Sequence, residues 1–106
     1  SAHKNKIDAL CKGAYEAFNK KSYTDSIKML KDALKQSPQD KDIKQALGVA
    51  YNGRGVANYN QGKFEHAIAD FEMAVQAWPA QNQYKLNAHW TKEAARRAAK
   101  GKKKKK

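Results

Sequence analysis

The sequence predicts an all-α protein made of two antiparallel helical hairpins, a fifth helix that covers the second hairpin, and a basic tail. Three observations lead to this fold class. The composition suits helices, because only 9% of the 106 residues are aromatic and only two are proline. Apolar residues recur three and four positions apart, which is the spacing of one helix face. The pattern that precedes Pro38 returns before Pro79, and internal repeats indicate stacked units.

The first predicted hairpin covers about residues 7–40. Large apolar residues form a seam along each of its two helices, and alanine where the helices cross lets the backbones approach closely. These positions, counted back from Pro38, are Leu34, Ala33, Leu30, Ile27, Ser26, Tyr23, Phe18, Ala14 and Leu10. The spacing predicts an antiparallel pair of helices.

The second predicted hairpin covers about residues 48–81, and it matches the first in residue type at nearly every position. Counted back from Pro79, the corresponding residues are Val75, Ala74, Phe71, Ile68, Ala67, Phe64, Tyr59, Gly55 and Tyr51. Two such units stacked on each other bury a continuous core, which neither unit could do alone.

The second unit resembles the tetratricopeptide repeat. The residues that carry the resemblance are Tyr51, Gly55, Gly62, Phe64, Ala67, Phe71, Ala74 and Pro79. The first unit is a degenerate copy, with Ala14, Lys21, Ser26 and Leu30 where the family has Gly, Gly, Ala and an aromatic residue. The resemblance implies a right-handed superhelical stack that forms a single domain over residues 1–100.

The third helix is predicted to be longer than the family requires. Pro38 and Pro79 are separated by seven residues more than the period of about 34 residues. Seven residues make nearly two helical turns, so an extension at 40–47 adds about 10 Å without turning the buried face. Ile43, Leu47 and Tyr51 then form one stripe.

The ends of this third helix follow from local signals. Ser37 as N-cap and Pro38 at the first helical position predict a start near Pro38 and an end near Gln61. A break at Asn52-Gly53-Arg54-Gly55 is the alternative, because Asn-Gly is a strong turn signal.

A covering helix is predicted over about residues 80–100, because the last hairpin of a stack leaves an apolar face open. Its expected seam is Leu86, Trp90, Ala94 and Ala98, which are four residues apart. Trp90 is therefore expected to anchor the core. Gly101 is expected to end the helix, and residues 101–106 are expected to form a disordered poly-lysine tail.

The charge of +12 is concentrated at the C-terminal end, where residues 85–106 hold ten Lys or Arg residues and one acidic residue. We call the basic residues of this region the basic arm: Lys85, His89, Lys92, Arg96, Arg97, Lys100, Lys102, Lys103, Lys104, Lys105 and Lys106. Two interpretations are open, a solvated tail or a surface that contacts the phosphates of RNA or another polyanion.

The resemblance also implies a binding groove, since the first helix of each hairpin in this family lines a concave surface that receives a peptide or a helix. The candidate groove residues carried over are Asp8, Lys12, Tyr15, Asn19, Asn52, Val56, Tyr59 and Asn60. For Tyr15, Val56 and Tyr59 the alternative is ordinary packing between hairpins.

The sequence offers no catalytic or metal-binding pattern, so we expect neither enzyme activity nor a cofactor. The three histidines lie in separate segments, and Cys11 is the single cysteine. Asp70 and Glu72 are two positions apart, so they point to different faces of a helix and cannot act as an acid/base pair. We expect both to be surface charges.

These observations favour a protein-interaction adaptor that holds a partner peptide or helix in the groove. The alternative is a subunit of a ribonucleoprotein or another large assembly, whose basic arm binds the RNA backbone. No apolar stretch approaches the length of a membrane span, and we expect a soluble, intracellular protein of undetermined compartment. Two repeats are few for independent stability, which favours self-association or dependence on a partner.

Overall fold

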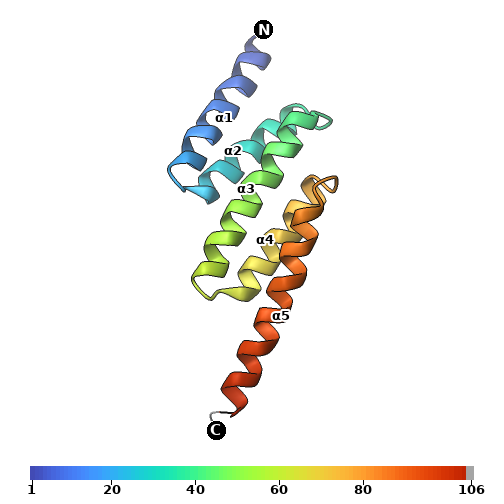
Figure 1. Ribbon diagram of the computed structural model, residues 1–106. Coiled ribbons are helices and arrows are strands. Elements are labelled where there is room, and N and C mark those ends of the chain that lie inside the picture. Colours follow the sequence, from blue (N-terminus) through green and yellow to red (C-terminus); the bar gives the residue numbers. More distant parts are fainter. Residues whose placement is uncertain (105–106) are drawn as a thin grey trace.

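The computed structural model describes residues 1–104, which form five α-helices in a single stack. The helices are α1 (Ala2–Asn19), α2 (Tyr23–Gln36), α3 (Lys41–Asn60), α4 (Phe64–Ala77) and α5 (Asn82–Lys104). Each packs on the next one in the chain, and α1, α3 and α5 run in one direction while α2 and α4 run back (Figure 1). The stack is elongated, at 63 × 26 × 17 Å. The predicted all-α arrangement of two hairpins and a fifth helix is confirmed.

The turns inside the two hairpins have the same geometry, although only the second contains glycine. Gly62 has a φ of 75° and Lys21, at the matching position, has a φ of 63°. In each turn the amide of the next residue donates a hydrogen bond to the carbonyl five residues earlier. Ser22 donates to Ala17 at 2.8 Å and Lys63 donates to Asn58 at 2.9 Å. The degenerate first repeat therefore keeps the glycine-type helix end with a lysine in the left-handed conformation.

The third helix is continuous, so the alternative break at Asn52-Gly53 is wrong. The glycines of α3 lie where neighbouring helices come close: a Cβ at Gly53 would lie 2.9 Å from the ring of Phe18, and one at Gly55 would lie 2.6 Å from the ring of Phe71. Both positions need glycine for packing, and the tertiary contacts outweigh the local turn tendency.

The predicted stripe of α3 is confirmed, because Ile43, Leu47 and Tyr51 are all buried. The predicted start of the helix is wrong by three residues. Asp40 is the N-cap, and its carboxylate accepts a hydrogen bond from the amide of Ile43 at 3.1 Å. Ser37 is instead the C-cap of α2, so the residue that makes the side-chain capping bond, Asp40, marks the start of α3.

The predicted seam of α5 is wrong, since a different face of the helix packs on the hairpins. Tyr84, Ala88 and Thr91 are buried, whereas Leu86 is 42% and Trp90 is 58% exposed. The buried residues repeat the spacing of Tyr51, Gly55 and Asn58 in α3, so α5 presents the same face as the first helix of a further repeat. Trp90 is therefore not a core anchor.

The expected end of α5 at Gly101 is also wrong. The helix continues to Lys104, because lysine has a high helix propensity and its positive charge is stabilising near the negative, C-terminal end of the helix dipole. The expected disorder of the tail is thus contradicted for residues 101–104, and Lys105 and Lys106 lie outside the described residues.

A polar cluster ties α2, α3 and α4 together around Asp70, which is only 4% exposed. Arg54 donates from Nη2 at 2.8 Å and from Nε at 3.1 Å to this carboxylate, and Asn58 donates to it at 2.9 Å. Arg54 also donates to the hydroxyl of Thr24 at 3.2 Å. Its hydrogen bond with Asp70 raises the pKa of Arg54 despite the opposing effect of burial. The expectation that Asp70 is a surface charge is therefore wrong.

Candidate protein-binding groove

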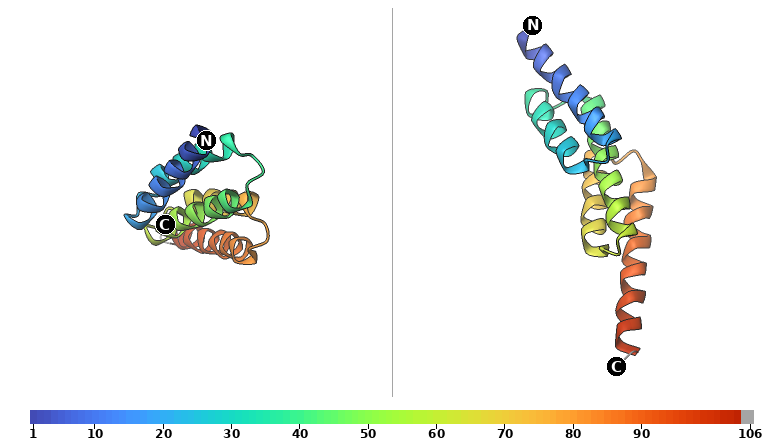
Figure 2. Two further views of the ribbon diagram at one scale, coloured as in Figure 1. Left: turned by 90° about the horizontal axis from the view of Figure 1, so that it is seen from above. Right: turned by 90° about the vertical axis from the view of Figure 1, so that its left-hand side faces the viewer.

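A groove of about 570 Å³ lies between α1 and α3, which are the first helices of the two hairpins. Viewed from above, α1, α3 and α5 follow one another across the stack (Figure 2). The wall from α1 includes Ile7, Cys11 and Tyr15, and the wall from α3 includes Ala46 and Val49. Its lining is mostly apolar, and the buried core residues Ala14, Leu30, Ile43 and Ala50 form its floor.

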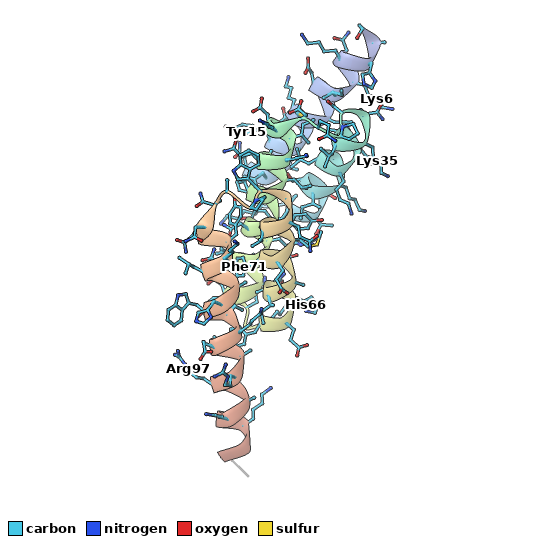
Figure 3. The ribbon with its side chains drawn as sticks, turned by 90° about the vertical axis from the view of Figure 1, so that its right-hand side faces the viewer. Lys6, Tyr15, Lys35, His66, Phe71 and Arg97 are labelled. Carbon is cyan, nitrogen blue, oxygen red and sulfur yellow. The ribbon has the colours of Figure 1, made fainter. Side chains whose placement is uncertain are left out.

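Two large side chains of this groove are exposed to solvent. Tyr15 is 69% exposed and Val49 is 43% exposed, and Tyr15 projects from the side of the stack (Figure 3). Packing between hairpins, the alternative considered for Tyr15, does not account for such exposure. An aromatic ring at the edge of an apolar groove is typical of a binding surface.

The candidate groove residues do not form one continuous site. Asp8, Tyr15 and Asn19 line the groove, and Lys12 is exposed on α1 outside its lining. Val56 and Asn60 line a separate hollow near the hairpin turns, which also includes Lys21, Tyr23 and Arg54. Tyr59 packs its ring against Phe64 at a centroid distance of 5.5 Å. Asn52 accepts a hydrogen bond from Asn87 of α5 at 2.8 Å, so its amide already has a partner.

Three carboxylates lie at the end of the groove nearest the start of α3. They belong to Asp8, Asp40 and Asp42, and within residues 1–104 no lysine or arginine lines the groove. Burial raises the pKa of the Cys11 thiol, and the charges of Asp40 and Asp8 raise it further. The thiol is therefore protonated at neutral pH, which makes it a weak nucleophile.

Several groove residues were missed in the sequence, namely Ile7, Cys11, Asp40, Asp42, Ala46 and Val49. The sequence contains a signal for three of them, because Asp42, Ala46 and Val49 are four and three positions apart and share one helix face. The repeat register predicts the segment 40–47 only as an extension of a helix. Its exposed face lengthens the wall of the groove.

The basic arm is helical where the structure describes it, and some of its charges are compensated. Lys92 pairs with Glu72 of α4 at 3.4 Å and Arg96 with Glu93 at 2.7 Å. Lys85, His89 and Lys92 line a shallow hollow against α4. Arg97, Lys100 and Lys102 are exposed on the part of α5 that projects beyond the hairpins (Figures 1 and 3).

Stacked helical hairpins with a groove along their first helices define a helical-repeat protein. Residues 48–80 match the family model described as the tetratricopeptide repeat. The second hairpin is therefore a tetratricopeptide repeat, as its residues predicted.

The solved structures that this chain is similar to include one titled the first TPR of Spaghetti (RPAP3) bound to the HSP90 peptide SRMEEVD. That chain is 15% identical, with a TM-score of 0.42, and the alignment covers 86% of this chain and 94% of that one. No curated protein sequence matches this chain. None of the helices in residues 1–104 is long and apolar enough to cross a membrane.

Proposed function

We propose that this chain is a non-catalytic adaptor that holds a peptide or a helix of a partner protein in the groove between α1 and α3. The observation that carries the proposal is the exposure of Tyr15 and Val49 on the two walls of one apolar groove. Burying these side chains against a partner would remove apolar surface from water, the main favourable term in most protein associations. Tyrosine is also enriched among the residues that dominate binding energies.

Replacing Tyr15 by alanine is expected to weaken partner binding about tenfold or more, because truncating an interface aromatic commonly costs more than about 1 kcal/mol. Peptides selected from a random displayed library on the intact chain provide the probe, and fluorescence anisotropy measures their affinity. Met73→Ala is the control, since Met73 is also a large exposed side chain but lies on α4, away from the groove. Equal affinities for the intact chain and Tyr15→Ala would contradict the proposal.

The second candidate function is that of an assembly subunit whose basic arm binds RNA. The observation that favours it is the continuation of α5 to Lys104, which displays Arg97, Lys100 and Lys102 beyond the hairpins. Cations on a projecting helix reach phosphates without obstruction from the stack. The absence of interleaved aromatic residues after Trp90 favours backbone contacts over base stacking.

Ending the chain at Lys100 is expected to remove most of the affinity for an arbitrary single-stranded RNA, measured by anisotropy across a salt series. The removed segment holds five lysines, and each lost phosphate contact reduces the slope of log K against log salt by about 0.7. The control replaces five exposed lysines of the first hairpin by glutamine: Lys4, Lys6, Lys28, Lys31 and Lys35. An equal loss in the control would show attraction to the net charge and would contradict a role of the arm.

A further inference from the structure

We propose that the groove between α1 and α3 receives α5 of a second copy of this chain. In this contact Trp90 packs between Tyr15 and Val49, and Arg97 meets the carboxylates of Asp8 and Asp42. The proposal goes beyond the proposed function, because it assigns an occupant that the chain itself supplies. It stands on the matched order of apolar and charged groups on the two surfaces.

The two walls of the groove carry the same groups in the same order. On α1, Asp8 precedes the exposed Tyr15 by seven residues, and on α3, Asp42 precedes the exposed Val49 by seven residues. Seven residues of helix span about 10 Å, and α1 and α3 run in the same direction (Figure 1). The groove therefore has an anionic end and an apolar end about 10 Å apart.

The exposed face of α5 carries the complementary groups at the same separation. Leu86, Trp90 and Arg97 are exposed and lie four and seven residues apart, which places them on one side of the helix. Arg97 follows Trp90 by seven residues, or about 10 Å. The order is apolar and then cationic, so α5 matches the groove when it runs antiparallel to α1 and α3.

The charges on both surfaces are available for such a contact. The ion pairs of the described residues join Arg54 to Asp70, Lys92 to Glu72 and Arg96 to Glu93. None of them uses Arg97 or the carboxylates of the groove. The carboxylate of Asp40 is fixed as the N-cap of α3. It therefore adds negative charge at the same end of the groove as Asp8 and Asp42.

The helix that fits the groove cannot reach it within one molecule. α5 packs on α4, and its C-terminal half projects from the end of the stack opposite to the N-terminus of α1 (Figures 1 and 2). The first turns of α1 carry Asp8, so the groups that match lie toward opposite ends of the molecule. The contact is therefore between two molecules, and it buries the large indole ring that the stack leaves exposed.

Sedimentation velocity over a concentration series tests the proposal, using the intact chain treated with nuclease so that nucleic acid cannot bridge copies. A single helix in a groove makes a small interface, so we expect association at concentrations in the micromolar range. Tyr15→Ala and Trp90→Ala should each weaken it tenfold or more. Met73→Ala, which changes an exposed side chain of α4, should not.

Mixing the two variants gives the decisive result. Tyr15→Ala keeps an intact α5 and Trp90→Ala keeps an intact groove, so an equimolar mixture is expected to form a complex of two chains and no larger species. Each variant alone should remain monomeric at the same concentration. A mixture that stays monomeric, or single variants that associate as well as the intact chain, would overturn the proposal.

Charge exchange tests the ionic part of the contact. Asp42→Lys and Arg97→Glu should each weaken association about tenfold. A mixture in which Asp42→Lys supplies the groove and Arg97→Glu supplies α5 should recover part of it, because the carboxylate of Asp8 remains in the groove. Lys85→Glu, the same change on another face of α5, should have little effect. The intact chain could also stay monomeric at several hundred micromolar while selected peptides still bind in a Tyr15-dependent way. This result would rule out the self-contact. The proposed function would stand, with another protein as the occupant of the groove.

Discussion

Replacing Arg54 by alanine is expected to lower the free energy of unfolding by roughly 3 kcal/mol, because the buried carboxylate of Asp70 then loses its cationic partner. In this variant the hydrogen bond from Asn58 to Asp70 remains, and water can enter the space left by the partly exposed guanidinium. The expected loss therefore lies at the lower end of the range for breaking a buried ion pair. Urea unfolding followed by circular dichroism measures the change.

The matched control for Arg54→Ala is Arg96→Ala. Both arginines form ion pairs of nearly equal length, 2.8 Å to Asp70 and 2.7 Å to Glu93, but the second pair lies at the surface. Exposed pairs contribute about 0–1 kcal/mol. Equal losses in the two variants would contradict a special role for burial of Asp70. Replacing Arg54 and Asp70 together by Met and Leu should recover most of the stability, since no charge is then left unpaired.

The fold class and the register of the hairpins could be predicted because each signal was supported twice, once in each repeat. The repeat pattern assigns Tyr51 to the core, and Ile43 and Leu47 lie on the same face of the helix. In α5 no second copy was available, and two apolar stripes compete on one helix. The spacing of Leu86 and Trp90 is as regular as that of Tyr84 and Ala88, and only the packing against α4 decides which stripe is buried.

The groove could be predicted only in part. The repeat register led to Asp8, Tyr15 and Asn19, but not to the opposite wall, because Asp42 and Val49 belong to an extension and to its junction with the second repeat. The pair of Arg54 and Asp70 was missed for another reason. The two residues are far apart in the sequence and on different helices, and no local spacing distinguishes a buried carboxylate from an exposed one.

Replacing Phe71 by alanine is expected to cost roughly 3–5 kcal/mol in the free energy of unfolding, whereas Lys63→Ala should be nearly neutral. Phe71 is 2% exposed, and its ring lies directly over Gly55. Equal effects of Phe71→Ala and Lys63→Ala, measured by urea unfolding, would contradict the assigned register.

Because Phe71 and Gly55 are in contact, we expect the effects of substituting them to be non-additive. Gly55→Ala alone should destabilise the protein by about 1–3 kcal/mol, because its Cβ would lie 2.6 Å from the buried ring of Phe71, which would have to move. In the Phe71→Ala background the same substitution meets a cavity, so it should be neutral or should stabilise α3 by up to about 1 kcal/mol through the higher helix propensity of alanine. The sign of Gly55→Ala therefore depends on residue 71, and additive effects in a double-mutant cycle would show that ring and glycine are not in contact.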